Sequence, residues 1–380
     1  MFLNSRYSIA FVCCLTVIFI SPALVFAQRG AISPPEHANQ EPINHLPNPY
    51  ETVRNFGTLP DGRTWGSVSA INVDIDGVHI WVGDRCGTNS CAESDVDPIV
   101  KMDPNGNIVQ SFGAGLITWP HGMDVDAEGN VWIVDARSPN ERELERTPNA
   151  PRNGHQVVKF SPEGEVLLVL GTPGERGNPP SHFSEPNDVA IAPDGHIFVG
   201  EAHNGQFLDE PGPNAIGRIS KFAPDGTFIK SWGQWGFRDG EFRAPHSLAF
   251  DSQGRLFVAD RGNNRIQIFD QEGNHLDTWY QFSRISGLFI DDNDVLYAID
   301  SESDPNYNPG GWRKGLRVGS ARTGEVWYFV REHVSERSSG MGGVGSMGEG
   351  VTADAEGNVY AGEVGPIQGV TKFIPRLIPD

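Results

Sequence analysis

The sequence predicts an all-β protein folded as a six-bladed β-propeller, and three observations support this. A repeat is present: segment 121–135 returns at 187–201, 246–260, 286–300 and 349–363. Each copy alternates apolar and polar residues on either side of a turn, which is the pattern of a β-hairpin. No long segment has helical periodicity, which excludes a helical solenoid. Because one small sheet cannot bury both of its faces alone, the copies must stack.

Each repeat predicts a four-stranded sheet. In the copy at 121–135, Met123 and Val125 lead to a glycine-containing turn at 128–130 and then to a second apolar run. A second hairpin follows the first one. Such second hairpins are found at 99–113, 155–171, 218–233 and 265–279.

The two ends of the chain are predicted to share one sheet. We count six copies, the first of which begins at Ser69. The last copy begins at Glu349 and lacks its outermost strand, because the chain ends soon after Phe373. The N-terminal segment 50–57 resembles the missing strand, so we expect it to complete the last sheet. Such closure leaves only short sheet edges exposed.

The N-terminal segment predicts export. Arg6 precedes an apolar stretch at 9–20, and small residues end at Ala27, so residues 1–27 resemble a secretory signal peptide. The alternative is a membrane anchor, but the apolar stretch is shorter than the roughly 20 residues that a membrane span requires. Residues 28–49 predict a flexible Pro-rich leader, and residues 50–380 the propeller. We therefore expect a secreted or periplasmic protein, with no stable membrane insertion once the signal is removed.

The net charge limits the classes of molecule that the protein is expected to bind. The formal net charge of −20 makes nucleic acid and anionic lipid surfaces poor partners.

Cys86 and Cys91 remain after signal removal, and in an oxidising compartment they are expected to form a small disulfide loop. Two free thiols are the alternative. A metal site made by this pair alone is disfavoured, because four ligands are normally needed.

A ring of polar residues predicts a metal site. In a propeller, the innermost strand of each blade lines the central channel, and its first residue lies at one mouth. Two imidazoles and a carboxylate there suit zinc, with three protein ligands and one open position. Calcium is the other option, because amide, carboxylate and carbonyl oxygens suit a hard cation. A purely structural reading is that these residues face channel water. The six first residues are Ser69, His121, Asn187, His246, Ser286 and Glu349.

An acidic residue ends the second strand of every copy, and the residues after it vary. Because an acid recurs in each blade, we expect it to cap loop N–H groups. Arginines at the channel mouth would hold a carboxylate with two hydrogen bonds, the alternative being surface ion pairs. The acids are Asp84, Asp135, Glu201, Asp260, Asp300 and Glu363, and the basic residues that follow are Arg85, Arg137, His203 and Arg261.

The repeats resemble NHL repeats, and their arrangement is similar to peptidyl-α-hydroxyglycine α-amidating lyases, which are six-bladed zinc propellers. The resemblance covers most of the chain, roughly 68–373. The two Pro-His segments and the Asp-Arg after the second are its more specific features. The matching segments are 119–126, 186–190, 226–233, 245–249 and 259–267.

The resemblance implies a zinc site with one departure. Two of the three zinc-binding histidines of the family match His121 and His246, whereas the third falls on Glu349. A methionine near the third ligand matches Met347. The calcium-binding acid of the family falls on Gly350, which makes a structural calcium doubtful. We therefore expect zinc or another divalent metal on His121, His246 and Glu349.

The resemblance also implies roles around the metal. The active-site arginines of the family match Arg261 and Arg85, and one or the other would hold the substrate carboxylate. The catalytic tyrosine falls on His203, which would act as the base. Asn187 and Met347 are the further expected substrate contacts.

The implied function is a secreted, metal-dependent lyase that cleaves a carboxylate-bearing, hydroxyglycine-type substrate at its C–N bond. The substrate would be a small molecule or a peptide C-terminus. A lactonase-type hydrolase on the same propeller and a non-catalytic NHL binding scaffold are the alternatives.

Overall fold

The structure is a computed structural model that describes residues 40–207, 215–332 and 347–376. The predicted signal peptide and the first part of the predicted leader lie outside these residues. Among the described residues, none of the helices has the length and apolar character that crossing a membrane would require. The described residues all belong to the compact unit Pro35–Asp380.

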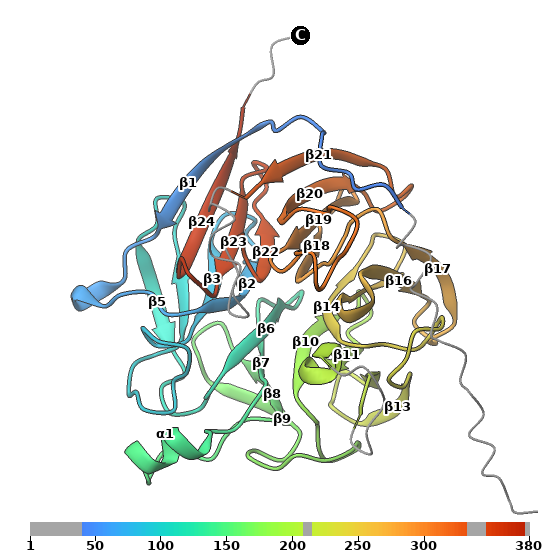
Figure 1. Ribbon diagram of the computed structural model, residues 1–380. Helices are drawn as coiled ribbons and strands as arrows, with labels where there is room; N and C mark the ends of the chain where they lie inside the picture. Colours follow the sequence, from blue (N-terminus) through green and yellow to red (C-terminus); the bar gives the residue numbers. More distant parts are fainter. Residues whose placement is uncertain (1–39, 208–214, 333–346, 377–380) are drawn as a thin grey trace, which may run out of the picture. The chain divides into compact units, whose positions relative to one another are not determined.

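Six four-stranded sheets surround a common axis, which confirms the predicted six-bladed propeller (Figure 1). Within each sheet, neighbouring strands are antiparallel, and the first strand of each repeat is innermost. Blades one to three contain β2 (Val68–Val73), β3 (Ile80–Asp84), β4 (Ile99–Met102) and β5 (Ile108–Phe112), then β6 (Pro120–Val125), β7 (Val131–Asp135), β8 (Gln156–Phe160) and β9 (Val166–Leu170), then β10 (Pro186–Ile191), β11 (Ile197–Glu201), β12 (Arg218–Phe222) and β13 (Phe228–Trp232).

Blades four to six follow the same order. They contain β14 (Pro245–Phe250), β15 (Leu256–Asp260), β16 (Arg265–Phe269) and β17 (His275–Trp279), then β18 (Gly287–Ile290), β19 (Val295–Asp300), β20 (Gly315–Ser320) and β21 (Val326–Arg331), then β22 (Gly350–Ala353), β23 (Val359–Glu363), β24 (Gly369–Pro375) and β1 (Tyr50–Phe56).

The sixth blade joins the two ends of the chain. The strand β1 pairs antiparallel with β24, with Thr52 opposite Phe373. This confirms that the N-terminal segment supplies the strand that the last repeat lacks. The backbone N–H and C=O groups at the edge of β24 are thereby paired, so they are not available to form a sheet with a strand of another molecule.

In the described part of the chain, short helices occupy four of the loops, and three of them, α1, η3 and η4, follow the second strand of a blade. The α-helix α1 (Glu141–Arg146) begins with a capping box, in which Asn140 and Glu143 satisfy each other's backbone N–H groups. The 3₁₀ segments are η2 (Pro60–Gly62), η3 (His203–Phe207) and η4 (Arg261–Asn263). The segments η3 and η4 carry His203 and Arg261, two of the predicted site residues.

Apolar side chains fill the spaces between neighbouring blades. Between the first two blades, Trp81 and Phe112 pack with Ile133 and Phe160. Burying each such side chain stabilises the fold by ~1.5–3 kcal/mol. The core is therefore divided among the blade interfaces.

The recurring acids are structural, as predicted. The carboxylate of Asp135 accepts hydrogen bonds from the backbone N–H groups of Thr118 and Trp119, at 3.1 and 2.7 Å. Glu363 differs and accepts from the hydroxyl of Thr371. Asp84, Glu201, Asp260 and Asp300 accept from backbone N–H groups in the same way as Asp135.

Residues 40–49, the described part of the predicted leader, lie against the fifth blade. The side chain of Asn44 donates to the carbonyl of Gly311 at 2.9 Å and accepts from Arg317 Nη2 at 3.1 Å. The carbonyl of Pro47 accepts from the backbone N–H of Phe329 at 3.2 Å.

Cys86 and Cys91 form the predicted disulfide.

Hydrogen bonds between blades surround one mouth of the channel. Each donor is the second residue of an inner strand, and each acceptor is a carbonyl at or just before the start of the next inner strand. Gly122 allows this close approach, because a Cβ atom there would clash with Asp188. The bonds are Ser69 Oγ to Pro120 O at 3.1 Å, His121 Nδ1 to Asn187 O at 2.7 Å, Asn187 Nδ2 to Pro245 O at 3.1 Å, and His246 Nδ1 to Ser286 O at 2.6 Å.

Candidate metal centre

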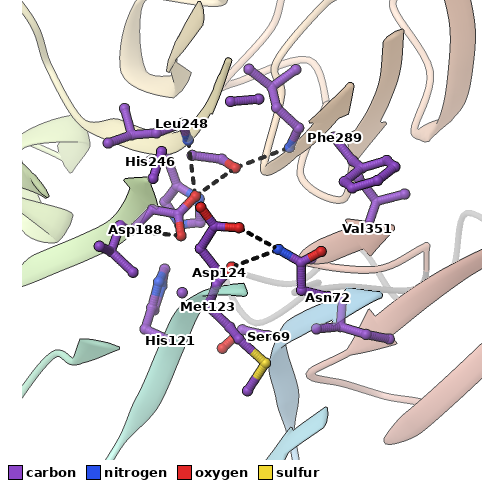
Figure 2. Close-up of a pocket in the computed structure, with 18 of the residues that line it drawn as sticks. Ser69, Asn72, His121, Met123, Asp124, Asp188, His246, Leu248, Phe289 and Val351 are labelled. Atoms are coloured by element: carbon purple, nitrogen blue, oxygen red, sulfur yellow. Dashed lines mark hydrogen bonds between the residues drawn. The ribbon is translucent and has the colours of Figure 1, made fainter. Parts of the chain in front are cut away.

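Four potential metal ligands meet at this mouth. His121, His203, His246 and Glu349 each bring one ligand atom, and these atoms all lie within 4.8 Å of one another. His121 and His246 lie on β6 and β14, and Figure 2 shows both in the lining of one pocket. The structure therefore brings together the three predicted metal ligands and the predicted base.

The inter-blade hydrogen bonds fix how His121 and His246 are oriented. Both donate through Nδ1 to a backbone carbonyl. Among the described residues, neither of their buried Nε2 atoms has a hydrogen-bond partner. A histidine that ligates a metal commonly donates its second ring N–H in this way, which fixes the tautomer and leaves a lone pair for the metal. Both residues thus have the environment of preoriented ligands.

Glu349 supplies an oxygen beside these nitrogens. Its Oε1 lies 3.2 Å from His246 Nε2 and 2.6 Å from Arg261 Nη1. Its Oε2 accepts a hydrogen bond from Ser301 Oγ at 2.9 Å. Ligand atoms that share a tetrahedral zinc ion at about 2.0–2.1 Å lie roughly 3.3 Å apart. The spacing between Oε1 and Nε2 is therefore compatible with a shared ion.

His203 is held differently from the other two histidines. Its ring centroid lies 4.9 Å from that of His121 and 5.4 Å from that of His246. No hydrogen bond to its ring nitrogens is seen within the described part of the chain. It lies in η3, outside the sheet. His203 therefore faces the cluster without the carbonyl contact that orients His121 and His246.

Burial and neighbouring charges set the protonation of the cluster. Burial lowers the pKa of His121 and of His203 well below the ordinary value, and it also lowers the pKa of His246. Burial alone would raise the pKa of Glu349, but Arg261 and His246 outweigh it and bring that pKa well below its usual range. At neutral pH the cluster therefore offers neutral imidazoles and an ionised carboxylate, which are the forms that bind metals.

This donor set fits a borderline divalent metal better than calcium. Two histidines and a glutamate form a common catalytic zinc site with an open position. Calcium takes six to eight oxygen ligands, which imidazole nitrogens do not supply. The cluster could thus hold a divalent metal of the class of zinc.

Arg85 is a buried cation without a carboxylate partner among the described residues. Its side chain is 3% exposed. It donates to Pro120 O at 3.0 Å, Ser69 Oγ at 2.7 Å and Asn89 Oδ1 at 2.6 Å, and it stacks 3.7 Å above the ring of Trp119. Burial lowers the pKa of Arg85 to about 9, so the guanidinium is still protonated at neutral pH.

Arg261 belongs to a charged network. Besides its contact with Glu349, its Nη1 lies 3.7 Å from Glu302 Oε1. Arg284 donates to the carbonyl of Arg261 at 2.9 Å and pairs with Glu302 at 2.9 Å. The two arginines and two glutamates of this network balance one another.

The two further predicted substrate contacts, Asn187 and Met347, stay predictions. The channel cavity of about 160 Å³ is lined by His121, His246 and Glu349, and its lining includes neither these two residues nor Arg85, His203 and Arg261. Asn187 is fully buried and joins two blades. Met347 packs in an apolar cluster between the fifth and sixth blades.

Sequence reasoning missed Trp119 and the network behind Glu349. The ring of Trp119 lies 5.2 Å from that of His121 and 5.5 Å from that of His203. Its position directly before Pro120 and His121 in the sequence could have indicated that Trp119 lies near the site. Ser301 and Glu302 follow the recurring acid of the fifth blade, the position that carries Arg85 and Arg261 in other blades, so that position could have indicated them.

Comparison with known proteins agrees with the fold and the repeats. A family model described as the NHL repeat matches residues 242–269. The chain is 33% identical over 331 residues to peptidylglycine alpha-amidating monooxygenase of Rattus norvegicus, covering 78% of this chain and 29% of that relative. It is 31% identical over 167 residues to the probable peptidyl-alpha-hydroxyglycine alpha-amidating lyase of Caenorhabditis elegans, covering 43% of this chain and 40% of that one.

A gluconolactonase from Xanthomonas campestris has a similar solved structure. The TM-score is 0.52 at 13% identity, and the match covers 86% of this chain and 90% of that chain. At this identity the likeness concerns the fold alone.

The six sheets define the chain as a six-bladed β-propeller, in which residues 242–269 match the NHL repeat. Within that class, its sequence resembles peptidyl-α-hydroxyglycine α-amidating lyase, as the Pro-His segments predict. The chain spans about 29% of the length of the rat monooxygenase.

We expect the purified protein to bind about one equivalent of a divalent metal. His121→Ala and His246→Ala should each weaken zinc binding by more than ~100-fold, because losing even an outer-shell partner costs roughly 10–100-fold. Elemental analysis and zinc titration measure this. His182→Ala is the control, because His182 contacts Ser181 and Glu175 away from the cluster. Unchanged zinc affinity in both ligand variants would contradict the site.

Proposed function

We propose that this protein is a metal-dependent lyase that cleaves the C–N bond of a carboxylate-bearing, α-hydroxyglycine-type substrate, such as a peptidyl-α-hydroxyglycine. The single observation that carries the proposal is the pair of free, buried Nε2 atoms of His121 and His246 beside Glu349 and His203. The similarity to proteins named amidating lyases supports the reaction type.

The substrate carboxylate is assigned to Arg85. This guanidinium is buried and charged, and among the described residues it has no carboxylate of its own. An incoming carboxylate would therefore complete its ion pair in a low-dielectric site, where such pairs are strong. The ring of Trp119 supports the guanidinium from one face.

His121, His246 and Glu349 would hold the metal. When bound, a divalent metal supplies Lewis-acid polarisation of the substrate hydroxyl oxygen, which makes its proton easier to remove. The inter-blade hydrogen bonds of the two histidines keep their Nε2 atoms aimed at one point. This preorganisation spares the site from rearranging during the reaction.

His203 is placed to move the proton. Burial keeps its imidazole neutral, so it can accept a proton at neutral pH. In the proposed reaction, the hydroxyl O–H bond breaks as its carbon forms a carbonyl, and the C–N electron pair leaves with the nitrogen. His203 accepts the hydroxyl proton and returns it to that nitrogen. The products are an amide and glyoxylate, and neither water nor an oxidant is consumed.

The two other functions predicted from the sequence, a lactonase and a binding scaffold, have less support than a lyase. A lactonase would consume water, and the likeness to the gluconolactonase extends only to the fold. A binding scaffold has no need of neutral, convergent imidazoles at its centre. The cluster therefore weighs in favour of an enzyme.

We expect the metal-loaded protein to release glyoxylate from an α-hydroxyglycine derivative. His203→Gln should lower kcat by about 10²–10⁴-fold, the usual contribution of a general base, while zinc stays bound. Arg85→Gln should mainly raise KM. A glyoxylate assay beside a lactone panel, with and without EDTA, measures this. Unchanged turnover in EDTA, or lactone hydrolysis without glyoxylate release, would rule the proposal out.

We also propose that the protein acts outside the cytoplasm. The Cys86–Cys91 disulfide supports an oxidising compartment, and segment 1–27 has the composition of a signal peptide. N-terminal sequencing of the protein produced in a secreting host should give Gln28 as the first residue. An intact N-terminus on a cytoplasmic protein would refute the proposal.

A further inference from the structure

Arg261 is directed at Glu349 and does not stand free in the cavity. Its Nη1 lies 2.6 Å from Glu349 Oε1. Arg261 comes from η4 in the fourth blade and Glu349 from the start of the sixth, so the contact spans the fifth blade. The two side chains are 1% and 6% exposed. A charge-assisted hydrogen bond in such buried surroundings holds both groups in one geometry.

Further contacts lock this geometry. Arg261 Nη1 also lies 3.3 Å from Ser286 Oγ, and the Arg261 carbonyl accepts from Arg284 Nη1 at 2.9 Å. Ser301 Oγ donates to the other oxygen of Glu349 at 2.9 Å. Each oxygen of Glu349 thus has its own donor. Carboxylates that ligate metals are commonly hydrogen-bonded in this manner, and their outer partners orient them.

The charges around the two arginines differ. Arg261 already faces Glu349 and Glu302, at 2.6 and 3.7 Å. A substrate carboxylate beside Arg261 would be a third anion around one cation and would be repelled by the other two. Arg85 has no carboxylate within ion-pair distance among the described residues. A substrate carboxylate therefore gains more from Arg85 than from Arg261.

We propose that Arg261 is a positioning residue that orients Glu349 as the third metal donor, and that Arg85 alone receives the substrate carboxylate. This division of roles rests on the proposed function. Burying a carboxylate unpaired is costly, so a glutamate at this position requires a nearby cation. An imidazole at the same position would be neutral and would not require one. The orienting role that we propose for Arg261 therefore applies to a carboxylate at position 349.

A double-mutant cycle on metal affinity tests this link. Zn²⁺ and Co²⁺ affinities are measured by chelator competition on the full-length, metal-stripped protein and its Arg261→Gln, Glu349→His and doubly substituted variants. We expect Arg261→Gln to weaken binding by about 10–100-fold. In the Glu349→His background the same change should cost less than about threefold, because the coupled partner is gone. Arg261→Lys, which keeps the charge, should lose less affinity than Arg261→Gln.

Arg85→Gln is the matched control within the same site. It should leave zinc affinity within about twofold of the wild type and should abolish the preference for a carboxylate substrate over its carboxamide analogue. The inference is overturned if Arg261→Gln binds zinc like the wild type, or if its loss is equally large in the Glu349→His background. If the wild-type protein binds neither Zn²⁺ nor Co²⁺, both this inference and the proposed metal site are refuted.

A crystal structure of the zinc-loaded wild type serves if Arg261→Gln does not fold. We expect Arg261 Nη1 to remain within hydrogen-bond distance of Glu349 while Glu349 ligates the ion. A guanidinium turned away from Glu349 and towards the cavity would overturn the inference.

Discussion

The candidate site depends on one repeated interaction: the side chain of the second residue of an inner strand donates a hydrogen bond to a backbone carbonyl at the start of the next inner strand. Ser69, His121, Asn187 and His246 all do this. For serine and asparagine the bond only joins two blades. For histidine it also uses up Nδ1–H, fixes the tautomer and aims Nε2 at the axis. A contact that joins neighbouring blades thereby leaves Nε2 available to a metal, so one interaction serves both the fold and the candidate site.

Charge balance explains the remaining architecture of the mouth. Three imidazoles are kept neutral, chiefly by burial. In each of the ion pairs Arg261–Glu349 and Arg284–Glu302, the positive and negative charges cancel. Arg85 is left as the cation without a carboxylate partner among the described residues. A divalent metal would add further positive charge, so an anionic substrate would be attracted to this mouth. In the proposed function, selection for carboxylates would follow from the pairing of the neighbouring charges, more than from the number of arginines.

Much of this could be predicted from the sequence, because the repeat carries its own register. The shared position in each copy identifies the residues at the start of the inner strands, and the similarity of segment 50–57 to an outer strand predicts the shared sixth blade. The partners of each side chain could not be predicted, because they cross between blades. The contact of Arg261 with Glu349 joins residues 88 positions apart, and nothing in a single repeat signals it. The sequence around Met347 likewise does not signal that its side chain packs in the apolar cluster between the fifth and sixth blades.

Anomalous diffraction at the zinc edge, from crystals of the zinc-loaded protein, tests the central claim most directly. The account predicts one strong peak on the channel axis, within bonding distance of the Nε2 atoms of both His121 and His246, with their Nδ1 atoms still bonded to the carbonyls of Asn187 and Ser286. A peak bound through Nδ1, or no peak at the axis, would contradict it.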